Sequence, residues 1–203
     1  MRHYIIAIQC FLLLLFTTTV SSNQSPLDLV RDTSTQILSI LNKEKEIIKQ
    51  NPDMLHEIIA NNVIPHFDFE RMGRWTLGKY WRDTNQQQRN KFMEEFRTLL
   101  IRSYGNVLIE YANAEIVYLP FRADINNTRA KVHAALSLPN ENAIKITYSL
   151  HSTTLGWKVY DVAVEGISLV TNYRNSFMRK VSQDGIDELI GQLAAKNNQD
   201  DTT

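Results

Sequence analysis

Apolar residues recur every three or four positions in the first half of the chain, which is the spacing of one face of a helix. The first such segment opens with Ser25 as a helix cap and Pro26 at the first helical position, and Pro52 ends it. Further helices are predicted over residues 52–62 and 67–80. The apolar face of the first helix comprises Leu27, Val30, Ile37, Leu38, Leu41 and Ile48.

A longer helix is predicted from Thr84 to Ala112, a stretch without proline. Thr84 and Gln87 have the spacing of a capping box, in which the two residues satisfy each other's backbone donors at a helix start. About 27 residues at 1.5 Å each make a rod of roughly 40 Å. Its broad apolar face carries Phe92, Phe96, Leu99, Leu100, Tyr104, Val107, Leu108 and Tyr111.

The pattern then changes to the alternation of strands, with short polar turns between the segments. Four strands joined by such turns predict an antiparallel meander, and two helical segments follow over residues 172–181 and 186–195. Helices, then strands, then helices indicate an α+β fold. The four strands are expected over residues 115–122, 128–138, 143–151 and 154–165.

The N-terminus has the pattern of a secretory signal peptide. Arg2 and His3 precede an apolar run over residues 5–20, and short residues up to Ser22 suit a cleavage site. The alternative is a membrane anchor, but a run of this length is shorter than the roughly 20 apolar residues of a spanning helix. We therefore expect a leader over residues 1–22, export without stable membrane insertion, one domain over residues 23–196 and a polar tail over 197–203.

Charge and cysteine content exclude several functions. The chain has 22 Lys and Arg against 22 Asp and Glu, so it lacks the positive charge that binding to nucleic acid requires. Its one cysteine, Cys10, lies in the predicted leader. A mature chain without thiols has no disulfide, no thiol nucleophile and no cysteine-bound metal.

The residues of catalytic type do not form a catalytic pattern. Asp161 and Glu165 share a strand face but lie roughly 13 Å apart, too far for a carboxylate pair of a glycosidase. His133 is a third isolated candidate. No two histidines have the i, i+4 spacing of a helical zinc site, and there is no phosphate-binding glycine loop. We expect no catalytic residue, no metal and no cofactor.

Three segments resemble the MlaC or toluene-tolerance auxiliary family of Gram-negative bacteria. They are LGWKVYDVAVEGISLVTNYR at residues 155–174, LGKYWR at 77–82 and ITYSL at 146–150, and the resemblance extends over about residues 52–195. Members of this family are periplasmic phospholipid carriers. The resemblance implies a curved, nuclear-transport-factor-like sheet, a monomer, and exchange of phospholipid with two partners: an inner-membrane ABC transporter complex with its lipid-binding subunit, and an outer-membrane lipoprotein–porin complex.

The residues alone are more typical of an ordinary core, whereas the resemblance implies that acyl chains lie between the sheet and the helices. Other expectations left open are a different apolar ligand, such as a hopanoid, fatty acid or solvent molecule, and a ligand-free structural adaptor. Tyr173 and Arg174 are expected at the headgroup or mouth. The expected lipid contacts are Tyr104, Val107, Leu108, Tyr111, Val117, Leu119, Val132, Ala134, Ile146, Tyr148, Leu150, Val162, Val164, Ile167 and Leu169.

Overall fold

The structure is a computed structural model, and it describes residues 24–121, 128–139 and 142–199. The predicted leader and its cleavage site lie outside these residues. Asn197, predicted from the sequence to begin a polar tail, is instead buried in the last helix, where its side-chain amide donates to the Glu95 carbonyl at 3.0 Å.

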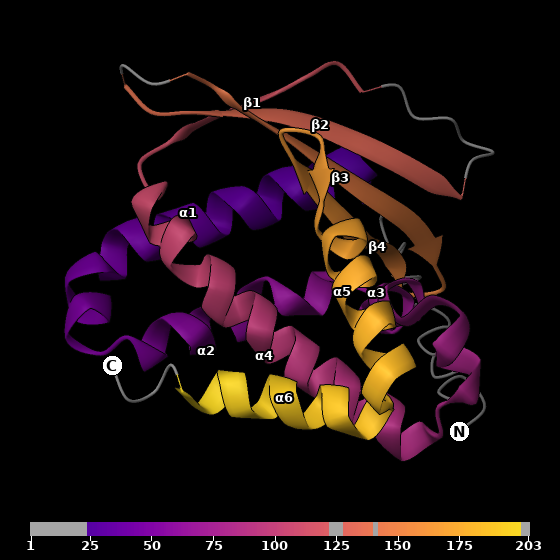
Figure 1. Cartoon of the computed structure of the whole chain (residues 1–203). Coiled ribbons are helices and arrows are strands. Elements are labelled where there is room, and N and C mark those ends of the chain that lie inside the picture. Colours follow the sequence, from indigo (N-terminus) through magenta and orange to yellow (C-terminus); the bar gives the residue numbers. More distant parts are fainter. Residues whose placement is uncertain (1–23, 122–127, 140–141, 200–203) are drawn as a thin grey trace, which may run out of the picture.

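Six α-helices and a five-stranded antiparallel sheet make up the described part of the chain, which confirms the α+β prediction (Figure 1). The strands lie side by side in chain order, as a meander. The helices are α1 (Pro26–Gln50), α2 (Asp53–Asn62), α3 (Phe69–Leu77), α4 (Gln86–Glu110), α5 (Leu169–Asp184) and α6 (Ile186–Gln199), with 3₁₀ turns η1 (Ile64–His66) and η2 (Gly78–Asp83). The strands are β1 (Glu115–Tyr118), β2 (Arg129–Ser137), β3 (Ile144–Thr153), β4 (Gly156–Val164) and β5 (Ile167–Ser168).

The helix starts follow from local capping chemistry. Ser25 accepts a hydrogen bond from the Asp28 amide, and Pro26 occupies the first turn of α1, as predicted. The capping box of α4 is one residue later than predicted: the Asn85 side chain accepts from the Gln88 amide, and Gln88 accepts from the Asn85 amide. Thr84 instead donates its hydroxyl to the Trp81 carbonyl at 2.7 Å and thereby closes η2.

The register of the sheet decides which side chains face the helices. Ile146 lies opposite Ala134 on β2 and Val164 on β4, and Tyr148 lies opposite Val132 and Val162. Residues directly opposite in an antiparallel pair share a face, so these side chains form one apolar surface. A bulge between Ser149 and Leu150 shifts the β3–β4 register, so that Leu150 pairs with Val159. The fifth strand, β5, was not predicted.

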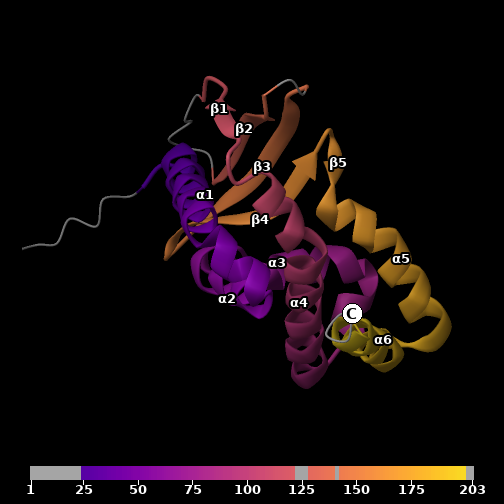
Figure 2. The same ribbon diagram turned by 90° about the vertical axis from the view of Figure 1, so that its left-hand side faces the viewer.

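The helices occupy one side of the sheet (Figures 1 and 2). The main core lies away from the sheet, where α3, α4, α5 and α6 meet around Phe92 and Phe96, both 0 % exposed. Phe177 of α5 packs against both rings at 5.7 and 5.5 Å. A second core joins α1, α2 and α4, and a third joins α1 to the sheet. The space between α1, α4 and the middle of the sheet is therefore bounded by three separate cores.

Replacing Asn85 with alanine tests the observed start of α4. The substitution removes the acceptor of the Gln88 amide and is expected to lower the free energy of unfolding by about 1 kcal/mol in urea titration. Gln87→Ala, at the position predicted from the sequence, is expected to change it by less than about 0.5 kcal/mol. Equal losses in the two variants would show that Asn85 does not cap the helix.

Candidate functional site

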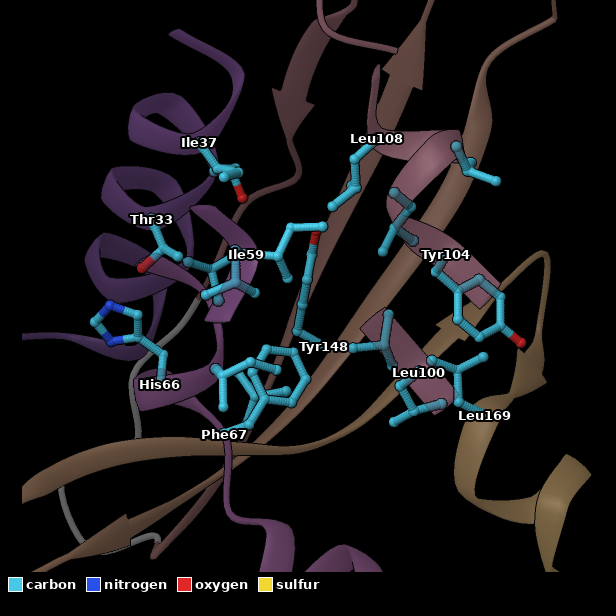
Figure 3. Close-up of a pocket in the computed structure, with 18 of the residues that line it drawn as sticks. Thr33, Ile37, Ile59, His66, Phe67, Leu100, Tyr104, Leu108, Tyr148 and Leu169 are labelled. Carbon is cyan, nitrogen blue, oxygen red and sulfur yellow. The ribbon is translucent and has the colours of Figure 1, made fainter. Parts of the chain in front are cut away.

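A cavity of about 300 Å³ lies between the inner face of the sheet and the helices (Figure 3). This volume is at the lower end of the range of roughly 300–1,000 Å³ for small-molecule sites. The N-terminal half of α1 makes one wall, α4 the opposite wall, and η1 with the start of α3 the base. Leu29, Val30, Ile37, Leu38, Ile59, Val63, Ile64, Phe67, Phe69, Met72, Leu100, Ile101, Ile116, Leu136, Ile144 and Val159 are among the apolar lining residues.

No Asp, Glu, Lys or Arg is present among the described residues that line the cavity. The polar side chains in the lining are three tyrosines, Thr33, Ser34 and His66. Two of the tyrosine hydroxyls are satisfied by neighbours: Tyr148 by Ser34 of α1 and Tyr104 by Tyr173 of α5. Because buried polar groups are stable only when hydrogen-bonded, these pairs let the cavity surface behave as apolar.

Three titratable groups of the lining, Tyr148, Tyr104 and His66, are shifted toward their neutral forms. Burial raises the pKa of Tyr148 to about 12, although its bond to Ser34 acts in the opposite direction. Burial, with the Tyr173 hydroxyl, raises the pKa of Tyr104 to about 12. Burial and then the nearby Lys158 ammonium lower the pKa of His66 below its usual 6.5, which favours the uncharged imidazole at neutral pH. The cavity therefore offers a neutral surface.

The base of the cavity is held against the sheet by polar contacts outside it. The Asp68 amide donates to the Val159 carbonyl at 2.8 Å, and Phe67 forms a parallel bridge with Val159. Arg71 donates to Nδ1 of His151 at 3.1 Å, so Nε2 of His151 carries the hydrogen and donates to the Asp68 carboxylate at 2.6 Å. These bonds fix η1 and the start of α3 along β4.

Many of the residues expected from the sequence to contact lipid come together in this cavity. Those from α4 and its C-terminal end and those from β3, β4 and the start of α5 face each other across it, although they lie 35 or more positions apart in the chain. Whether they touch a ligand stays a prediction. The expected residues that line the cavity are Tyr104, Val107, Leu108, Tyr111, Ile146, Tyr148, Val162, Val164 and Leu169.

Val132, Ala134 and Leu150 lie on the same sheet face but do not line the cavity. They are at most 2 % exposed, and Val132 and Leu150 pack in the core that joins α1 to the sheet. Where α1 approaches the sheet its side chains fill the space, and the cavity begins only where the two separate. At these three positions the side chains are covered by other parts of the protein, where contact with lipid was expected.

Val117, Leu119 and Ile167 point to solvent, with exposures of 49, 50 and 65 %. On β1 the inward positions are Ile116, which lines the cavity, and Tyr118, which packs beside the third core. The apolar residues chosen from the sequence therefore lie on the outer face of β1. This correction follows from the two-residue period of a strand, in which neighbours face opposite sides.

Tyr173 and Arg174, expected at the mouth, have structural contacts and do not line the cavity. The Tyr173 ring packs against Phe96 at 5.4 Å. Arg174 donates to the Trp75 carbonyl near the end of α3. A Cβ on Gly78, where φ is +55°, would stand 2.9 Å from the Arg174 guanidinium, so both this φ and the close approach favour glycine.

The three side chains considered for catalysis also have structural contacts. The Asp161 carboxylate accepts a hydrogen bond from the Val170 amide in the first turn of α5 at 3.1 Å. Glu165 accepts from the Lys145 amide at 2.5 Å, and His133 bonds Thr147 at 3.0 Å. In the described part of the chain no group of three His, Cys, Asp or Glu side chains is placed to hold a metal.

The α1 wall was missed from the sequence. Its apolar spacing predicted an amphipathic helix, but nothing in the pattern indicated that its N-terminal half faces a cavity and its C-terminal half a core. Thr33 and Ser34 interrupt the apolar face where it turns toward the sheet, and this interruption was the available signal. The missed α1 residues are Leu29, Val30, Thr33, Ser34, Ile37 and Leu38.

The family model described as MlaC protein matches residues 31–195, which include all the residues that line the cavity except Leu29 and Val30. The chain belongs to the MlaC family. It is 30% identical over 177 residues to the toluene tolerance protein ttg2D of Pseudomonas putida, covering 87% of this chain and 82% of that protein. It is 26% identical over 182 residues to the intermembrane phospholipid transport system binding protein MlaC of Haemophilus influenzae, covering 88% and 85%.

A solved structure that contains a phospholipid has the same fold. The phospholipid-binding protein of Ralstonia solanacearum, determined in complex with a phospholipid, superposes with a TM-score of 0.79 and 25% sequence identity over 85% of this chain and 97% of that one. Among the helices described for the present MlaC-family chain, none is both long and apolar enough to cross a bilayer.

The neutral tyrosines predict a loss of stability at high pH. An unfolded tyrosine ionises near pH 10, whereas Tyr148 in the folded chain has a pKa of about 12. Between these values the folded state binds more protons, so the free energy of unfolding falls as the pH rises, by about 1 kcal/mol at pH 11 for this residue.

Urea unfolding at pH 9 and pH 11 measures this loss. Tyr148→Phe is expected to remove about 1 kcal/mol of the difference between the two pH values. Tyr80→Phe is the control, because Tyr80 is on the surface and burial does not raise its pKa overall. An unchanged pH dependence in Tyr148→Phe would contradict the neutral, buried state assigned to this hydroxyl.

Proposed function

We propose that this chain is a periplasmic phospholipid carrier that holds acyl chains in the cavity between α1, α4 and the sheet. The observation that carries the proposal is the lining of that cavity, which holds no Asp, Glu, Lys or Arg among the described residues and in which two of the three tyrosine hydroxyls are bonded to neighbouring side chains. Such a surface binds hydrocarbon and offers no charged group for catalysis. Non-enzymatic binding is therefore the function that fits this site.

Family membership supports phospholipid as the ligand. The Ralstonia solanacearum relative binds a phospholipid in the same fold, and the Haemophilus influenzae relative is named for intermembrane phospholipid transport. The apolar run at residues 5–20 supports export. On this basis the carrier moves lipid between an outer-membrane lipoprotein–porin complex and an inner-membrane ABC transporter, and so maintains the lipid asymmetry of the outer membrane.

The energetics of acyl chains constrain how such a carrier exchanges lipid. Burying two chains of about 15 methylenes at ~0.8 kcal/mol each yields on the order of 24 kcal/mol relative to water. That value exceeds the practical ceiling of roughly 18–21 kcal/mol for non-covalent binding. A bilayer shelters the same chains, so transfer from bilayer to cavity is close to neutral. Loading and unloading therefore take place while the carrier is docked to its membrane partners.

The first prediction concerns the purified protein. Chain isolated from a Gram-negative periplasm is expected to carry a diacyl phospholipid in a near-stoichiometric amount, measured by native mass spectrometry and by lipid identification after organic extraction. A hopanoid, a free fatty acid or a solvent molecule in its place would contradict the phospholipid assignment. Protein that is empty and takes no phospholipid from vesicles would contradict the carrier function and favour an adaptor.

The second prediction places the ligand in this cavity. Ile146→Trp fills the space beside Val164 on the inner face of the sheet and is expected to lower retained phospholipid at least about tenfold, a loss of roughly 1.4 kcal/mol. Val117→Trp is the matched control, because Val117 lies on the outer face of the same sheet.

A second variant keeps the test decisive if Ile146→Trp does not fold. Leu108→Trp introduces the same bulk from the α4 wall and is expected to have the same effect. Circular dichroism and urea titration check that each variant is folded. Normal lipid retention in folded Ile146→Trp and Leu108→Trp would exclude the cavity as the binding site.

A further inference from the structure

The edge of the cavity at η1 differs in chemistry from the rest of the lining. His66 and Thr33 lie together on one side of the cavity, and Tyr104 and Leu169 lie on the opposite side (Figure 3). Phe67 pairs with Val159 in parallel, a register that places His66 alongside Lys158 of β4. The Lys158 ammonium donates to the Pro65 carbonyl at 2.5 Å, directly beside the His66 peptide. An imidazole and an ammonium thus lie near each other at this edge, and the Thr33 hydroxyl lies on the same side of the cavity as the imidazole.

These groups have no anion to match them in the described part of the chain. Within the described residues no ion pair joins His66 or Lys158 to a carboxylate, and the one charged neighbour that shifts the pKa of His66 is Lys158. Asp68 is the carboxylate nearest to His66 along the chain. Its side chain accepts hydrogen bonds from Nε2 of His151 at 2.6 Å and from the Arg71 amide at 2.8 Å. A basic edge without a counter-ion, next to an apolar cavity, attracts a ligand that combines an anionic group with hydrocarbon.

The opposite end of the cavity is apolar where the edge at η1 is basic. Val107 and Val164 line it and are 44 and 38 % exposed, and Ile167 beside Val164 is 65 % exposed. The neighbouring charged group is the Glu165 carboxylate, held by the Lys145 amide. An apolar rim with a carboxylate disfavours a phosphate and suits the ends of acyl chains.

We propose that His66, Lys158 and Thr33 form an anion subsite that takes the phosphodiester of the bound lipid, with the acyl chains running from there past Phe67 toward Val164. This inference rests on the proposed function and adds the orientation of the ligand. The ammonium of Lys158 supplies charge, and the imidazole and hydroxyl supply hydrogen bonds to the phosphate oxygens. Lys158 lies at the surface, so the remainder of the headgroup stays in solvent.

Lipid selectivity tests the subsite. Full-length mature protein is incubated with vesicles that contain dioleoyl phosphatidylglycerol and dioleoylglycerol in equal amounts, and the retained lipids are quantified by mass spectrometry. The two lipids have the same acyl chains and differ in the phosphate. Lys158→Met is expected to lower the ratio of phosphatidylglycerol to diacylglycerol about tenfold, the effect of losing one charge-assisted hydrogen bond. Lys131→Met, a lysine exposed on β2, is the matched control and is expected to leave the ratio unchanged.

Each outcome has a separate meaning. Equal ratios in Lys158→Met and Lys131→Met, with both lipids retained, would overturn the subsite and leave the carrier function intact. Retention of neither lipid by the unmodified protein would contradict the carrier function itself. Binding of inorganic phosphate that Lys158→Met abolishes, with an unchanged lipid ratio, would assign the edge to a free anion and overturn the headgroup assignment. His66→Phe in the same assay is expected to lower the ratio in the same direction, because it removes the second donor.

Discussion

An uncharged cavity of about 300 Å³ inside a chain of this size is the constraint on which the rest of the structure depends. At about 24 cal/mol per Å³, leaving such a volume empty forgoes on the order of 7 kcal/mol, which is comparable to the whole stability of an ordinary domain. The walls must therefore be held apart by contacts made elsewhere, and hydrocarbon that fills the cavity returns part of this energy. Stability and occupancy are linked through that volume.

Three cores and one set of polar bonds hold the walls. The aromatic core around Phe92 and Phe96 joins α4 to α5 and α6, so much of the support of α4 comes from contacts outside the cavity. The α1 wall is supported from its two ends, by the core with α2 and by the core with the sheet. The bonds of Asp68 to His151 and Val159 fix the base along β4. These polar groups lie outside the cavity, so they hold its walls in place without adding charge to its lining.

Local features of the sequence predicted most elements, whereas the site depends on tertiary packing. Periodicity identified the helices and four strands, and alternation placed Ile146 and Tyr148 correctly on the inner face. Alternation failed on β1, because a strand of four residues at a sheet edge has apolar residues on both faces. Val132 and Ile146 are equally apolar and lie on neighbouring strands of one face, yet one is covered by α1 and the other faces the cavity. Whether such a residue is in the core or lines the cavity depends on where α1 packs against the sheet. The periodicity of the sequence does not predict that position.

The two ends of the cavity differ in chemistry, and this difference favours one orientation of a bound ligand. A neutral lining holds hydrocarbon in either direction with equal energy, so orientation is decided at the ends alone. Under the proposed subsite, the basic edge at Lys158 and the apolar rim at Val107 and Val164 favour one orientation, with the phosphate at the basic edge and the chain ends at the rim. Because the rim is apolar, it is also the end whose exposure to water is least favourable when the carrier is free. For the carrier function proposed above, contact of this rim with an apolar surface removes an exposed apolar patch at the end of the cavity where the proposed orientation places the chain ends.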